Sequence, residues 1–150
     1  MVSIRTYLNP LLFLEPLSDK SKPEIVEFFL IKDKTGKTHV AAEIRDTILS
    51  DVFIVPPNEL RLSIDGEKPF TVWKFDSLPG GASNTDFVHD FYVSELVCGN
   101  YSCRRPVINL GFSLSGKTVF PQTSGKHHLD LWVSDFSGNQ SQRSFDWELK

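Results

Sequence analysis

Apolar and polar residues alternate along the last third of the chain, and this period of two restricts the fold more than any other feature. In "HHLDLWVSD", Leu129, Leu131 and Val133 share one face, and Trp132 lies on the other with its polar neighbours. The closing "RSFDWELK" repeats the pattern with aromatic and aliphatic residues at every second position. Successive side chains of a strand point to opposite faces, so both segments predict strands with one buried face.

Similar runs occur earlier in the chain. Alternation at Val40, Ala42 and Ile44 predicts a half-buried strand. The run "LRLSI" alternates in the same way, and the Asp65-Gly66 pair that follows predicts a hairpin. "FVHDFYVSELV" fits a strand or a short helix, and its aromatic residues favour a strand. Further strands are predicted over residues 25–31, 70–75 and 108–114.

This spacing of short strands, without a long helical period, predicts an all-β fold. We expect an immunoglobulin-like antiparallel β-sandwich of about 7–9 strands with an extended N-terminal segment. Residues 1–23 would form an extended turn and connector, and residues 24–150 the sandwich.

The apolar run "LLFL" near the N-terminus is short because Pro10 and Pro16 enclose it. A signal peptide needs roughly 7–15 uninterrupted apolar residues and a membrane-spanning helix about 20. Prolines also interrupt helices. We therefore expect neither a signal peptide nor a membrane span in this chain.

The charge and cysteine content limit the partners and the compartment. A net charge of −3 gives no basic field for phosphate backbones, so we expect no nucleic-acid partner. Cys98 and Cys103 enclose a short Gly- and Asn-containing segment that suits a hairpin tip. They either form a disulfide, which implies an oxidising compartment, or remain two unpaired thiols.

The sequence predicts no metal ligand set, cofactor or catalytic residue. His127 and His128 are adjacent and would face opposite sides of a strand. The segment "SDFSGN" resembles a calcium loop, but its few oxygen ligands favour Asp135 as an acceptor for turn amides before Asn139. Acidic residues mostly alternate with apolar ones, as on a solvated strand face, so a hydrolase built from them is the third-ranked hypothesis.

Two tryptophans are candidates for stacking on a sugar. Trp132 lies on the strand face opposite Leu129, Leu131 and Val133, and Trp73 lies in the strand after the predicted hairpin. An outward Trp132 would stack a ligand, pack under a neighbouring domain, or cover its own sheet.

Three segments carry a family resemblance: "YLNPLLFLEPLSDKSKPEI", "LRLSIDGEKPFTVWKFD" and "GKHHLDLWVSDFSGNQSQRSFDWEL". They are similar to the region that follows the catalytic domain in lysostaphin-type zinc metallopeptidases of bacterial envelopes. There, an N-P-L-L-F turn and a D-x-x-x-P-x-I connector lead into a β-rich region that ends in D-x-x-G-N and an aromatic strand. The zinc ligands of that family lie upstream of the turn, and this chain contains no equivalent.

The resemblance implies a non-catalytic accessory domain of a peptidoglycan metallopeptidase, either within a longer peptidase or as a free-standing copy. Its partner would be a catalytic domain, upstream or on a separate chain, and an exported parent would place it in the periplasm or cell envelope. The alternative is a carbohydrate- or peptidoglycan-binding module for cell-wall glycan. The predicted strip for docking on the catalytic domain comprises Tyr7, Leu8, Pro10, Leu11, Leu12, Phe13 and Leu14.

Overall fold

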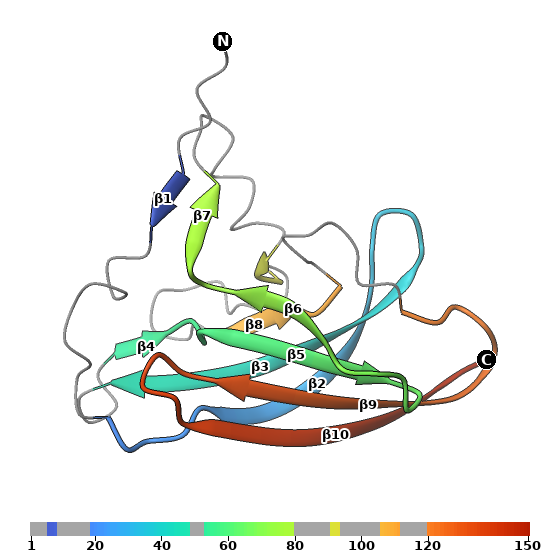
Figure 1. The fold of residues 1–150 in the computed structure, drawn as a ribbon. Helices are drawn as coiled ribbons and strands as arrows, with labels where there is room; N and C mark the ends of the chain where they lie inside the picture. The colour runs from blue at the N-terminus through green and yellow to red at the C-terminus, as the bar shows by residue number, and fades with distance from the viewer. Residues whose placement is uncertain (1–5, 9–18, 49–52, 80–90, 94–105, 112–119) are drawn as a thin grey trace, which may run out of the picture.

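The structure is a computed structural model, and it describes residues 6–8, 19–48, 53–79, 91–93, 106–111 and 120–150. The first half contains β1 (Thr6–Leu8), β2 (Glu24–Lys32), β3 (Thr38–Ile48), β4 (Phe53–Val55) and β5 (Glu59–Ile64). The second half contains β6 (Phe70–Lys74), β7 (Ser77–Pro79), β8 (Val107–Asn109), β9 (Gly125–Ser134) and β10 (Gln140–Leu149). Figure 1 shows the strands in two layers.

Two antiparallel sheets pack against each other, so the chain is an all-β sandwich, as the alternation predicts. One sheet has the order β10-β9-β5-β6. In the other, β2 pairs with one edge of β3, and both β8 and β4 pair with β3. A separate two-stranded ribbon joins β1 to β7, with Tyr7 opposite Leu78, and rises above the sandwich in Figure 1.

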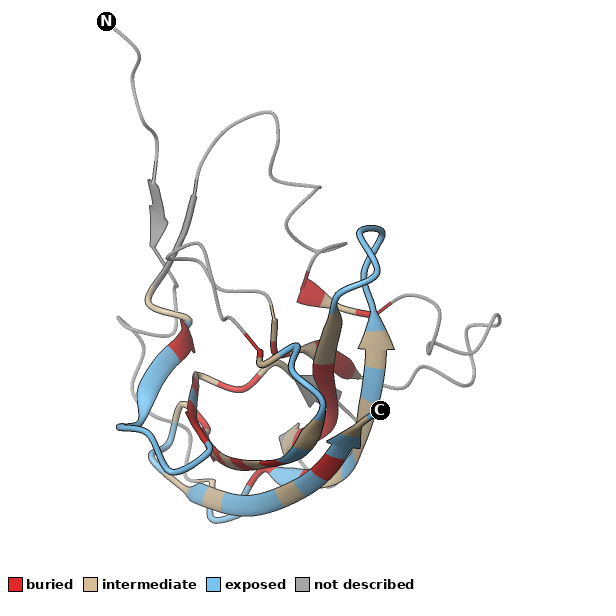
Figure 2. Ribbon diagram, turned by 90° about the vertical axis from the view of Figure 1, so that its right-hand side faces the viewer, coloured by how far each residue is buried: buried red, intermediate tan, exposed pale blue. Residues whose placement is uncertain are grey.

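The alternate residues of β5 and β9 form the centre of the core. Leu60 and Leu62 of β5 and Leu129 and Leu131 of β9 are each 0% exposed, and the two strands pair directly. Figure 2 shows buried residues recurring along these central strands, whereas β10, at the edge of the sheet, is mostly exposed or intermediate. The predicted burial of one face is confirmed for β9.

Strand β3 differs from the prediction because both of its faces are buried. Val40, Ala42 and Ile44 belong to the main core. Ala41, on the opposite face, packs in a second cluster with Val107, which lies in the neighbouring strand β8. The expectation of a half-buried strand is therefore wrong, because other segments cover the second face.

The predicted hairpin at Asp65-Gly66 is confirmed. Asp65 has φ 51° and Gly66 has φ 77°, and the backbone N–H of Glu67 donates to the carbonyl of Ile64 at 3.0 Å. Positive φ at both central residues is the type I′ geometry that matches the twist of paired strands. Glycine adopts this conformation without steric cost.

Arg143 joins the two sheets where β10 lies against β2. Its Nη1 donates to the carbonyl oxygens of Ile25, at 2.8 Å, and Val26, where the register of β2 shifts. Its guanidinium carbon lies 5.8 Å from the centroid of Phe28, which stacks on Phe145 at 5.0 Å. A bulge interrupts the hydrogen bonds between paired strands and leaves backbone carbonyls without a strand partner. Arg143 donates hydrogen bonds to two such carbonyls.

Gly111, just after β8, is closely packed against a histidine. A Cβ atom at this position would lie 2.6 Å from Nδ1 of His39 and 3.0 Å from Oδ1 of Asn109. The imidazole of His39 is held by Asp33, whose Oδ2 lies 2.9 Å from its Nε2. The close approach requires a residue without a side chain here.

Candidate functional site

Trp132 lies on the outer face of the β10-β9-β5-β6 sheet, as its place in the alternation predicts. Its neighbours Leu131 and Val133 are buried in the core, whereas the indole is half-buried. Across the sheet it pairs with Arg61 on β5 and Gln142 on β10. An aromatic ring thus lies on a polar strand surface, between the polar side chains of two neighbouring strands.

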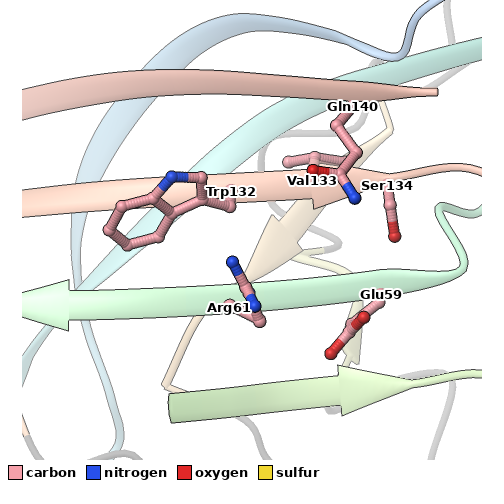
Figure 3. Close-up of a pocket in the computed structure, with 6 residues that line it drawn as sticks. All are labelled: Glu59, Arg61, Trp132, Val133, Ser134 and Gln140. Atoms are coloured by element: carbon pink, nitrogen blue, oxygen red, sulfur yellow. The ribbon is translucent and has the colours of Figure 1, made fainter. Parts of the chain in front are cut away.

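Arg61 is a charged partner of this ring. Its guanidinium carbon lies 5.9 Å from the centroid of Trp132, within the range of a cation–π contact. Figure 3 shows the two side chains side by side, from β5 and β9. The contact holds the guanidinium beside the indole, where one ligand would touch both.

A small depression opens beside the pair and is drawn in Figure 3. Glu59 is fixed in it, because the hydroxyl of Thr71 donates to its Oε1 at 3.0 Å. The site therefore offers an aromatic surface, a cation, a carboxylate, a hydroxyl and an amide. Its lining residues are Glu59, Arg61, Trp132, Val133, Ser134 and Gln140.

Sequence reasoning identified Trp132 but missed Arg61 and Glu59. Both belong to the polar positions of β5, which alternation assigns only to a solvated face. Their proximity to Trp132 depends on the pairing of β5 with β9, two strands that are far apart in the sequence. The residue pattern within either strand does not indicate that the two strands pair.

Polar side chains that contact one another lie at the other end of the outer face of the β10-β9-β5-β6 sheet. Nδ1 of His128 lies 2.6 Å from Oδ1 of Asp146, and the hydroxyl of Ser144 donates to Oδ1 of Asp130 at 2.6 Å. The hydrogen bond to Asp146 is the main cause that raises the pKa of His128, with a smaller contribution from Asp130. These groups bind one another, so they are less available to a ligand.

Trp73 is not available for stacking, which corrects the prediction that paired it with Trp132. It is 2% exposed, and its ring centroid lies 4.5 Å from that of Phe91 and 5.7 Å from that of Phe75. Where β6 pairs with β5, Trp73 lies opposite Leu60 and Thr71 opposite Arg61, so Val72 has no partner in the ladder. Both Val72 and Trp73 are buried. The irregularity breaks the alternation and turns the indole into the core.

The predicted docking strip and the cysteines fall mostly outside the described residues. Tyr7 and Leu8 belong to β1 and pair with Leu78 and Ser77 of β7. The rest of the strip, Pro10, Leu11, Leu12, Phe13 and Leu14, lies outside the described residues, as do Cys98 and Cys103.

The adjacent histidines face opposite sides of β9, as predicted, and His127 lies on the buried side. Its Nδ1 lies 2.9 Å from Oδ2 of Asp65, and its Nε2 lies 3.0 Å from the carbonyl oxygen of Thr123. Both partners are acceptors, so both ring nitrogens donate only when the imidazole is protonated. The Thr123 carbonyl, followed by the Asp65 carboxylate, raises the pKa of His127 above 6.5.

This geometry makes the stability of the fold depend on pH through His127. A histidine whose pKa is higher in the folded state stabilises the fold fully below about pH 6.5, and this stabilisation is lost as the pH rises through the folded pKa. We expect the melting temperature of His127→Asn to be lower than that of the parent at pH 6, with a smaller difference at pH 9. Thermal melts of both proteins from pH 5.5 to 9 measure it, and a constant difference would contradict the protonated state.

Asp135 has the turn role that the sequence predicts. Its Oδ1 accepts the backbone N–H groups of Ser137 and Asn139, both at 2.8 Å. The carboxylate thereby fixes the turn between β9 and β10, the turn that also sets the position of Gln140 beside the depression.

Among the described residues, no helix is both long and apolar enough to cross a membrane. Comparisons of the chain with protein-family models, with curated proteins and with solved structures gave no match.

Proposed function

We propose that this chain is a non-catalytic binding module for cell-wall carbohydrate, and that Trp132 is its stacking surface. The observation that carries the proposal is the half-buried indole beside Arg61 at a depression that also contains Glu59. The sugar rings of a glycan present apolar C–H faces that pack on an aromatic ring, whereas their hydroxyl groups need donors and acceptors. The depression offers both kinds of contact.

Peptidoglycan is the glycan that this proposal favours. Its strands carry carboxylates as well as hydroxyl and amide groups, and the guanidinium of Arg61 binds carboxylates with two parallel hydrogen bonds. Ser134 and Gln140, which also line the depression, supply a hydroxyl and an amide for the neutral groups. This assignment agrees with the resemblance to a domain of envelope peptidases.

The second candidate is the accessory role, in which the domain packs on a catalytic metallopeptidase domain and positions it. The β1–β7 ribbon favours this role, because it places Tyr7 and Leu8 above the sandwich, apart from the two main sheets (Figure 1). The two roles use different faces and are compatible in one protein.

We also propose that the sandwich is of the immunoglobulin type. The sheets β10-β9-β5-β6 and β2-β3-β8 correspond in strand order to the G-F-C-C′ and A-B-E strands of such domains. Immunoglobulin-type domains commonly serve as interaction modules, which suits both candidate roles.

The glycan proposal is tested by binding the full chain to purified peptidoglycan sacculi, with bound protein measured after sedimentation. We expect Trp132→Ala to weaken binding at least about tenfold, equivalent to roughly 1.4 kcal/mol, because the stacking surface is removed. Trp132→Phe, which keeps a smaller ring, should retain part of the affinity.

Gln142→Ala provides the matched control, since Gln142 neighbours Trp132 on β10 but does not line the depression. Its binding should equal that of the parent, and thermal melts should show that all variants fold. If Trp132→Ala bound sacculi as tightly as the parent, the glycan proposal would fail and the accessory role would become the leading one.

A further inference from the structure

Three carboxylates from distant parts of the chain meet at one end of the sandwich. Asp19 belongs to the segment before β2, Asp46 lies near the end of β3, and Asp135 begins the turn after β9. One carboxylate oxygen from each lies within 4.8 Å of those from the other two. Like charges at this separation repel one another, so the arrangement needs a physical cause.

Asp46 points to a missing ligand. It is 1% exposed, and its Oδ1 accepts no hydrogen bond from any group in the part of the chain that the structure describes. A buried polar atom without a partner is costly, and a buried charge without one costs more. The carboxyl of Asp46 therefore requires a cation or donor that the described chain does not supply.

No basic side chain of the described residues compensates these charges. The ion pairs of the described Lys, Arg and His side chains are made with other carboxylates. Burial, followed by the negative charges of Asp135 and Asp19, raises the pKa of Asp46 to about 6. The described residues therefore leave this carboxylate cluster without a cationic partner.

Asn139 holds two of the three segments in place. Its Nδ2 donates to Oδ2 of Asp135 at 2.7 Å and to the backbone carbonyl of Asp19 at 3.1 Å. The segment before β2 is thereby fixed to the β9–β10 turn independently of any ion. The cluster is consequently a built arrangement and not a chance approach of exposed side chains.

We propose that Asp19, Asp46 and Asp135 bind one divalent cation, and that this cation is calcium. Calcium takes oxygen ligands at about 2.3–2.6 Å, so oxygens around one ion lie up to about 5 Å apart, as these do. It also tolerates irregular geometry, whereas magnesium requires a near-ideal octahedron. Zinc favours nitrogen and sulfur ligands, which the cluster does not offer.

The bound ion would join the segment before β2 to both layers of the sandwich, since Asp46 belongs to one sheet and Asp135 follows a strand of the other. Of the three carboxylates, sequence reasoning considered only Asp135, together with Asn139, and it predicted no metal site. The other two carboxylates come from segments that only the fold brings near it.

The test is the thermal stability of the full chain, freed of metal by chelation, at pH 7.5 and constant ionic strength. For a dissociation constant near 1 mM, about 10 mM calcium chloride should raise the melting temperature of the parent by about 3–5 °C. Asp46→Asn and Asp19→Asn should lose most of this rise. Titration calorimetry of the parent should show one site.

Asp146→Asn is the control, because Asp146 is an exposed carboxylate that pairs with His128 outside the cluster; it should keep the full rise. Asp19→Asn keeps the test valid if the buried substitution fails to fold. An absent rise in the parent, or an equal rise in the Asp19 and Asp46 variants, would overturn the proposal. Equal stabilisation by magnesium chloride at the same concentration would overturn the choice of calcium.

Discussion

Replacing Trp73 with alanine is expected to lower the free energy of unfolding by about 3–5 kcal/mol. The side chain is 2% exposed and packs against Phe91 and Phe75 in the core. Its removal takes a large apolar surface out of the folded state and leaves a cavity that the surrounding strands fill only in part. Chemical denaturation monitored by far-UV circular dichroism measures the change.

Trp132→Ala is the matched comparison, since it removes the same side chain from the outer face. The indole there is half-buried and contacts Arg61 across the sheet, so we expect a loss of about 1 kcal/mol or less. Equal losses for the two variants would show that the indole of Trp132 also contributes to the core. Such a result would contradict its assignment as a ligand surface.

Gly111→Ala is expected to destabilise the fold by about 1–3 kcal/mol, because the added methyl group overlaps the imidazole of His39. A Cβ at this position lies 2.6 Å from Nδ1 of His39, a separation that non-bonded atoms do not tolerate. Asp33 holds the ring from its other side, so the ring cannot move away without losing that contact. Urea denaturation of the variant measures the effect.

A double-mutant cycle with His39→Ala identifies the cause. Once the imidazole is removed, the methyl group at position 111 has space, so the double variant should lose less stability than the two single variants together. Additive losses would mean that the cost of Gly111→Ala comes from the backbone and not from this contact.

The sequence predicts a part of the fold well where the residue pattern of a single segment is enough to indicate its conformation and its buried face. Leu129, Leu131 and Val133 alternate strictly, and β9 buries that face and leaves the other only partly buried. The Asp65-Gly66 turn is predictable for a similar reason, since these two adjacent residues are of the types that a type I′ turn favours at its central positions.

The remaining features depend on contacts between segments that are distant in sequence. Ala41 is buried by a second cluster that includes Val93 and Val107, and alternation within β3 cannot indicate a cover on its other face. Trp73 turns inward because β6 pairs irregularly with β5. The candidate site required the same kind of information, since Trp132 was identifiable from its own strand but Arg61 only from the pairing of β5 with β9.

Because both faces of β3 are buried, a substitution on one face also affects the packing on the other. Ala41 and Ala42 are both 0% exposed and face opposite clusters, so their methyl groups set the spacing of two interiors at once. A larger residue at either position would push the backbone toward the other interior. The two hydrophobic regions are therefore mechanically coupled, and sequence variation on one side of β3 is limited by the packing on the other.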